Sequence, residues 1–186
     1  MRFTPVLLAA VGAIIAGSYT IDPNLEDGIY FIPLLTNSSK FRRSEPIYGE
    51  PIRIADAVYP KTLSERSVVG VVPVPADSNS CYQATESRSD LDGAKNSLST
   101  VCGRGVKIRQ WYEVSGLLLA RYASSLAFAC SWGGKQGCAP NEIDNAWSQI
   151  TNNCDGDLKS GHICASSWKK CYGHSTVTSQ ICDNTV

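Results

Sequence analysis

The spacing of apolar residues in the second half of the chain predicts two amphipathic helices. The first starts at Ser89 or Asp90, either of which can cap it, and ends at Cys102-Gly103, where the glycine suits a left-handed cap. The second starts with Pro140 in its first turn and ends near Cys154. The apolar residues at helical spacing are Leu91, Ala94, Leu98 and Val101 in the first helix, and Ile143, Trp147 and Ile150 in the second.

Runs of β-branched, aromatic and leucine residues predict strands between and after these helices. Residues 106–114, 116–122 and 126–130 are separated by short serine and glycine turns, as in an antiparallel meander. Residues 131–138 form a glycine-rich loop, and residues 161–168 form a last strand before a terminal turn. The order predicts an α+β fold, a small disulfide-stapled sandwich with two helices packed on one face of an antiparallel sheet of about four strands.

The preceding part of the chain, residues 19–75, predicts an extended arm that contains no cysteine. Its short apolar segment, residues 28–35 (GIYFIPLL), is expected to add an edge strand to the later domain. We therefore divide the mature chain into this arm and a cysteine-rich α+β domain at residues 76–186. The prolines that would interrupt a long strand or helix in the arm are Pro33, Pro46, Pro51 and Pro60.

Residues 1–18 have the layout of a secretory signal peptide. Arg2 supplies a positive start, residues 6–16 are apolar, and Ala16-Gly17-Ser18 supplies small residues for cleavage. The apolar run is too short for a membrane span, which needs about 20 residues. The alternative is a buried N-terminal helix. The first interpretation predicts a protein that is secreted to the extracellular space, without stable membrane insertion.

Two short motifs in the arm point to processing in the secretory pathway. Asn37 begins an N-glycosylation sequon, which places it on the surface if it is used. Arg42-Arg43 is a dibasic pair in a polar setting, where a dibasic-specific protease can cut an exported precursor. Cleavage there would make residues 19–43 a pro-segment, and the alternative is two solvated arginines.

The charge balance argues against a nucleic-acid partner. The chain has 17 basic and 17 acidic residues, and loss of Arg2 with the signal leaves a net charge of −1. A nucleic-acid-binding domain normally carries a basic field that collects phosphates, and an anionic membrane surface attracts proteins in the same way. We expect a monomer with an unknown host protein or glycan as its partner.

Eight cysteines predict four disulfides, because an even number of cysteines in an exported chain is typical of a disulfide framework. His162, Cys164, Cys171 and His174 also resemble a zinc-ligand set, but their spacing is not that of known zinc motifs, so we expect no metal. Short loop closure suggests the pairs Cys130–Cys138 and Cys164–Cys171, although the count allows many connectivities. The cysteines are Cys81, Cys102, Cys130, Cys138, Cys154, Cys164, Cys171 and Cys182.

The stretches "DGIY", "CY…C", "YASSLAFAC…C" and "SGHICASSWKKCYGH…IC" resemble small cysteine-rich secreted proteins of filamentous fungi, many of them classed as candidate effectors. The likeness spans roughly residues 27–182. It implies that Cys164 and Cys171 are an addition to a six-cysteine set, which favours their mutual bond. The predicted element order is also similar to that of killer-toxin-like and secreted necrosis-inducing proteins of fungi. This second likeness concerns the fold alone.

The sequence offers little for catalysis, so we expect neither an enzyme nor a cofactor. A secreted hydrolase or nuclease could use His174 as a base with Glu113 and either Arg109 or Arg121. The paired carboxylates of a glycosidase are not apparent, since Asp155 and Asp157 lie in a D-G-D sequence typical of a solvated turn.

Aromatic residues in the cysteine-rich part instead suggest binding, since exposed aromatics beside polar groups suit sugar stacking or a protein contact. Trp147 matches the helical spacing and is expected in the core. The leading hypothesis is a non-enzymatic secreted effector or binding protein acting on a host or competitor molecule. The alternatives are the hydrolase or nuclease above and a membrane-active toxin using the segment GLLLARYASSLAF. The candidate contact residues are Trp132, Trp168, Lys169, Lys170, Tyr172 and His174, with packing of Trp168 and Tyr172 over the sheet edge as the alternative.

Overall fold

The computed structural model describes residues 19–35, 47–58, 73–103, 116–132 and 137–182. Its two helices are α1 (Arg88–Gly103) and α2 (Pro140–Asn153). The strands are β1 (Tyr19–Thr20), β2 (Gly28–Leu35), β3 (Ile47–Tyr48), β4 (Ile52–Ala55), β5 (Ser78–Thr85), β6 (Gly116–Tyr122), β7 (Ser125–Ser131), β8 (Lys159–Ala165), β9 (Lys170–Thr176) and β10 (Gln180–Ile181).

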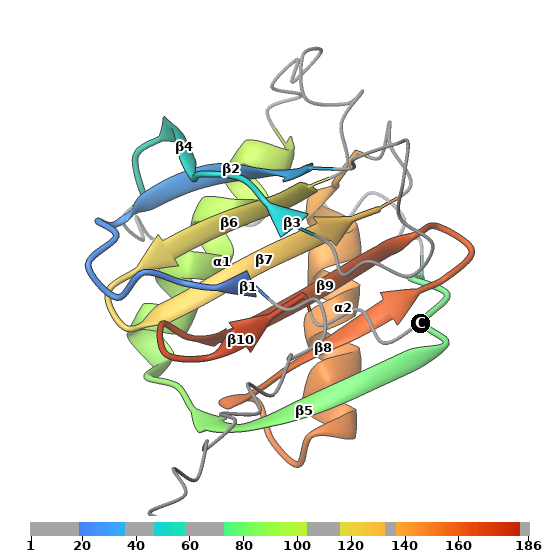
Figure 1. Cartoon of the computed structure of the whole chain (residues 1–186). Coiled ribbons are helices and arrows are strands. Elements are labelled where there is room, and N and C mark those ends of the chain that lie inside the picture. Colours follow the sequence, from blue (N-terminus) through green and yellow to red (C-terminus); the bar gives the residue numbers. More distant parts are fainter. Residues whose placement is uncertain (1–18, 36–46, 59–72, 104–115, 133–136, 183–186) are drawn as a thin grey trace, which may run out of the picture.

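An antiparallel sheet dominates the molecule, and it is larger than the sequence suggests. Eight strands run in the order β3-β2-β6-β7-β9-β8-β5, with β4 also pairing with β2 (Figure 1). The prediction of two helices on a sheet of about four strands is therefore wrong, because the protein is mostly β. The predicted strand at residues 106–114 lies outside the described residues.

Strand β2 supplies much of the difference. It pairs with β6 on one side and with β3 and β4 on the other, so it is an interior strand rather than an extended arm or an edge. Its apolar side chains face both surfaces of the sheet: Ile29 lies in the helix-side core and Ile32 in the opposite one. A continuous apolar run is what a strand buried on both faces needs. Pro33 is tolerated near the end of β2, where its carbonyl accepts a hydrogen bond from the Gly49 amide.

The two predicted helices are confirmed, and both lie on the same face of the sheet, behind it in Figure 1. Helix α1 packs on β6 and β7, and α2 packs on β8 and β9. Gly93 of α1 contacts the ring of Tyr122 so closely that a side chain at position 93 would collide with it. Neither described helix is long and apolar enough to cross a lipid bilayer.

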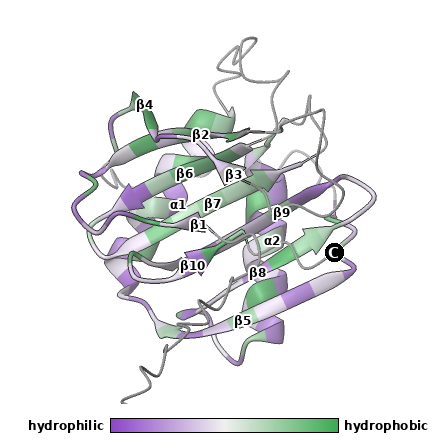
Figure 2. Ribbon diagram, viewed as in Figure 1, coloured by the Kyte–Doolittle hydropathy of each residue, from purple (hydrophilic) through white to green (hydrophobic). Residues whose placement is uncertain are grey.

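The opposite face of the sheet is also covered, by a two-stranded ribbon of β1 and β10. Beneath this ribbon lies a second core that includes Leu117, Phe128 and Ile181. Figure 2 shows apolar residues along β2, β6 and β7, while the edge strand β5 is largely polar. The molecule thus has three layers: helices, sheet and ribbon.

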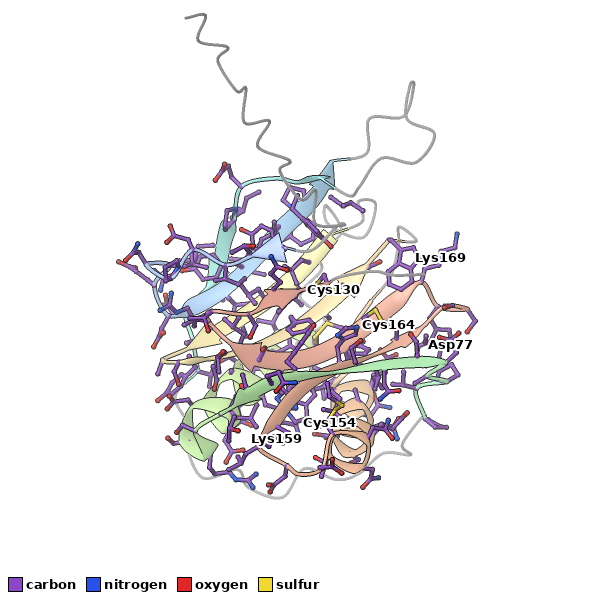
Figure 3. All side chains as sticks on the ribbon, turned by 60° about the horizontal axis from the view of Figure 1, so that its bottom comes forward. Asp77, Cys130, Cys154, Lys159, Cys164 and Lys169 are labelled. Carbon is purple, nitrogen blue, oxygen red and sulfur yellow. A yellow bond between two sulfur atoms is a disulfide. The ribbon has the colours of Figure 1, made fainter. Side chains whose placement is uncertain are left out.

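All eight cysteines are paired in four disulfides. The predicted bond Cys164–Cys171 is confirmed, joining directly opposed residues of β8 and β9 with Cα atoms 4.0 Å apart. The predicted bond Cys130–Cys138 is wrong, because Cys130 faces the ribbon-side core while Cys138 packs against the helix-side core. The other bonds are Cys81–Cys154, Cys102–Cys138 and Cys130–Cys182. Figure 3 labels Cys130, Cys154 and Cys164, each of which belongs to a different pair.

Candidate functional site

The two histidines of the antiparallel strands β8 and β9 lie on opposite faces of the sheet. His162 of β8 faces the ribbon side, where its Nδ1 lies 2.7 Å from the Tyr82 hydroxyl. His174 of β9 faces the helices and stacks on Trp147. Because Cys164 and Cys171 are bonded to each other, the four residues do not form a shared ligand set. Among the described residues, no group of histidine, cysteine, aspartate and glutamate side chains could hold a metal ion.

His174 is part of a buried pair that sequence reasoning did not identify. Its Nδ1 hydrogen-bonds Oε2 of Glu86, and the residues are 1% and 4% exposed. Oε1 of Glu86 and the indole nitrogen of Trp147 are both buried without a hydrogen-bond partner among the described residues. Glu86 directly follows the polar strand β5, and no periodicity in the sequence marks it as buried. His174 was predicted as a contact residue, and its burial excludes that role.

The geometry also separates the residues of the nuclease hypothesis. His174 points toward the helices, whereas Arg121 of β6 points toward the opposite face and donates to the carbonyl of Pro23 at 3.0 Å. Arg121 also lies near Asp27, with their nitrogen and oxygen atoms 3.8 Å apart. The other two candidates, Glu113 and Arg109, lie outside the described residues.

Lys170 and Tyr172 form a second buried polar cluster with Glu142 of α2. The Lys170 ammonium group donates to Oε2 of Glu142 at 2.9 Å and to the Gly137 carbonyl at 2.5 Å. The Tyr172 hydroxyl donates to the same carboxylate oxygen. Burial, reinforced by the negative charge of Glu142, raises the pKa of Tyr172 far above 10.0, its ordinary value. Both residues were predicted to contact a partner, but they join β9 to the start of α2 in the interior.

The remaining predicted contact residues gather at one end of the sheet, which we call the β8–β9 end (Trp132, Trp168 and Lys169). Trp132 and Trp168 are half-buried against opposite cores, and Lys169 is exposed in the turn between β8 and β9. The Trp132 amide donates to the Lys169 carbonyl at 3.1 Å. The amide of Ser166 donates to the Asp77 carboxylate at 3.1 Å, which fixes the turn. Figure 3 shows Lys169 and Asp77 at this end, away from Lys159.

The structure also contains a groove between α1 and α2, which the sequence did not predict. We call it the interhelical groove, and its volume is about 320 Å³. Lys95 of α1 and Asp144 of α2 form an ion pair across it, with nitrogen and oxygen 2.8 Å apart. A second ion pair, Arg88–Asp157, lies in the same lining. Other lining residues are Leu91, Asp92, Trp147, Ser148, Thr151 and Asn152.

Comparisons with known proteins identify no family for this chain. No family model, no curated protein and no solved structure matches it. The function must therefore be inferred from the disulfides, the β8–β9 end and the interhelical groove.

Proposed function

We propose that the protein is a secreted, non-enzymatic binding protein that acts outside its cell on a host or competitor molecule. Four disulfides in a chain of this size carry the proposal, because such frameworks persist in oxidising compartments and are typical of extracellular proteins. Each bond restricts the unfolded chain and adds about 2–4 kcal/mol to stability. The resemblance to cysteine-rich fungal proteins supports an effector role, and the N-terminal signal supports export.

The β8–β9 end is the proposed contact surface. It combines two half-buried indole rings, one on each face of the sheet, with an exposed cation on a turn that hydrogen bonds hold in place. Rigid aromatics lose little conformational entropy on binding, and tryptophan is over-represented among residues that dominate binding energy. Partly buried tryptophans beside an exposed lysine suit a protein surface or a glycan chain.

The other two functions find less support among the described residues. The segment GLLLARYASSLAF of the toxin hypothesis forms β6 and β7, whose apolar side chains lie in the two cores. Ile52 is the only large hydrophobic residue exposed in the described part of the chain. The nuclease hypothesis required an accessible His174, and Trp147 covers it.

Expression of the full chain in a secreting fungal host tests export. We expect culture-fluid protein that lacks residues 1–18 and gains two hydrogens per disulfide on reduction, as intact mass spectrometry would show. Retention of an uncut, reduced chain inside the cells would overturn the proposal.

A charge reversal tests the contact surface. Fluorescently labelled wild-type protein should accumulate on the target cells or tissue, and Lys169→Glu should reduce this labelling at least tenfold. Lys159→Glu is the matched control, because Lys159 is an exposed lysine at the opposite end of β8. Equal labelling by the wild type and both variants would refute the assignment of the β8–β9 end.

A further inference from the structure

We propose that the interhelical groove binds an uncharged saccharide. This site goes beyond the β8–β9 end and does not depend on it. The volume of about 320 Å³ is at the lower limit for small-molecule sites, which usually measure about 300–1,000 Å³. The groove therefore fits a ligand of the size of a short sugar or the end of a glycan chain.

The lining of the groove favours a ligand with polar groups on every side. Pockets for drug-like or lipid ligands are lined mainly by apolar side chains. Here only Leu91 and Trp147 supply an apolar floor, and the walls carry carboxylate, hydroxyl, amide and guanidinium groups. Carboxylates accept hydrogen bonds, lysine and arginine donate them, and an amide does both. A sugar hydroxyl can form a hydrogen bond with each of these groups, because a hydroxyl both donates and accepts.

The charges of the groove argue against an anionic ligand. Its two cations are already neutralised, Lys95 by Asp144 and Arg88 by Asp157. Asp92 adds a carboxylate without an ion-pair partner among the described residues. No cation is left in the lining for a phosphate, a sulfate or an acidic sugar, and a polycation would find a single unpaired carboxylate there. The remaining match is a neutral polyhydroxylated ligand.

The groove is also held rigid before any ligand binds. The bond Cys102–Cys138 joins the end of α1 to the segment that leads into α2. The bond Cys81–Cys154 joins the residue after α2 to β5. Trp147, which forms part of the floor, stacks on the buried His174, and His174 is hydrogen-bonded to Glu86. Rigid walls reduce the entropy lost on binding, which matters most for sugars because each hydrogen bond competes with water.

Thr151 and Asn152 add hydrogen-bonding groups at the end of α2. The side chain of neither makes a hydrogen bond within the described part of the molecule, so both are available to a ligand. Asn152 is exposed and Thr151 is half-buried. With Asp92 on α1, they place acceptors and donors on both walls of the groove.

A glycan array followed by titration calorimetry on the purified, oxidised protein tests this site. The probes are neutral oligomers of glucose, mannose and N-acetylglucosamine, with a polyuronate and spermidine as charged comparisons. We expect binding of at least one neutral class, and a tenfold or larger loss of affinity in Asp92→Asn and in Asn152→Ala. The matched controls are Asp155→Asn and Asn153→Ala, which alter exposed neighbours of the same type outside the lining.

Each outcome decides the proposal. Absence of neutral-sugar binding, or a preference for the polyuronate or spermidine, would overturn it. Sugar binding that Asp92→Asn and Asn152→Ala leave intact would also overturn it, and abolition of that binding by Lys169→Glu would move the sugar to the β8–β9 end. That last result would leave the proposed function standing, so the two failures are distinguishable.

Discussion

Trp147 lies almost parallel to His174, with ring centroids 5.0 Å apart and planes inclined by 28°. The indole therefore separates the interhelical groove from the buried Glu86–His174 pair. Within the described residues, His174 is the only hydrogen-bond partner of the Glu86 carboxyl group. This interior polar pair joins the segment after β5 to β9 beneath α2.

Replacement of His174 by phenylalanine should strongly destabilise the protein. The Glu86 carboxyl group would remain buried without a partner, and such a loss costs about 3–5 kcal/mol. Urea denaturation followed by circular dichroism would measure the change in the free energy of unfolding. A paired variant, Glu86→Leu with His174→Phe, should recover part of the loss, because it removes the unpaired polar group. Equal stability of His174→Phe and the wild type would refute the prediction.

The contribution of Asp90 to the free energy of unfolding should depend on pH. A hydrogen bond from the Ser124 hydroxyl, at 2.7 Å, is the main cause that lowers the pKa of Asp90 below its ordinary 3.8. A lowered pKa in the folded state means that this stabilisation is present above pH 3.8 and is lost as the pH falls through the folded-state value. Ser124→Ala should raise the Asp90 pKa toward 3.8, which NMR titration of the side-chain carboxyl carbon would detect. An unchanged titration curve in Ser124→Ala would contradict this assignment.

The spacing of apolar residues predicted two kinds of element: helices that bury one face, and strands with a continuous apolar run. Helices α1 and α2 begin and end close to the predicted residues, and β6 spans the predicted 116–122. Strand β9 lies where the sequence predicts a terminal turn, and its sequence, KCYGHST, is mostly polar. Its lysine and histidine are buried all the same, since each meets a glutamate from a distant part of the chain. No local pattern reveals such a partner.

The candidate site shows the same limit. The tryptophan and lysine residues of the β8–β9 end are of types common in binding sites, so the sequence could predict them as contact residues. It could not separate Lys169, which is exposed, from Lys170, which is buried, because that depends on the turn between β8 and β9. The interhelical groove depends on two helices that lie side by side although residues 104–139 separate them in the chain. The error at Cys130 has a related cause, since the side of the sheet to which a strand residue points depends on its register.

Ala123 should be replaceable by glycine with a gain in stability. It lies in the tight turn between β6 and β7 with a φ of 48°, a left-handed conformation that an L-residue adopts at a cost of about 1–2 kcal/mol. Glycine removes this cost but gives more freedom to the unfolded chain, so the expected net gain is about 0.5–1 kcal/mol. Thermal denaturation would show a higher Tm. The same change at Ala127, a fully buried residue of β7, should lower the Tm. A lower Tm in Ala123→Gly would refute the prediction.

Cleavage after Arg43 should leave the N-terminal fragment bound to the rest of the protein. The fragment would contain β1 and β2, and β2 pairs with β6 in the interior of the large sheet. Ile29 and Ile32 are fully buried, so release would expose both cores to water. No cysteine precedes Cys81, so the association would be non-covalent.

A site-specific protease recognition sequence placed after Arg43 would allow this cut to be made on the purified protein. Size-exclusion chromatography of the cut protein should show one species of unchanged size. In denaturant without reductant, residues 19–43 should separate from the disulfide-bonded remainder. The uncut protein, which cannot separate, is the control. Spontaneous loss of the fragment under native conditions, with the remainder still folded, would instead identify it as a true pro-segment. The interior position of β2 argues for the first result, since its removal would leave one edge of β6 unpaired, with β7 as the remaining neighbour.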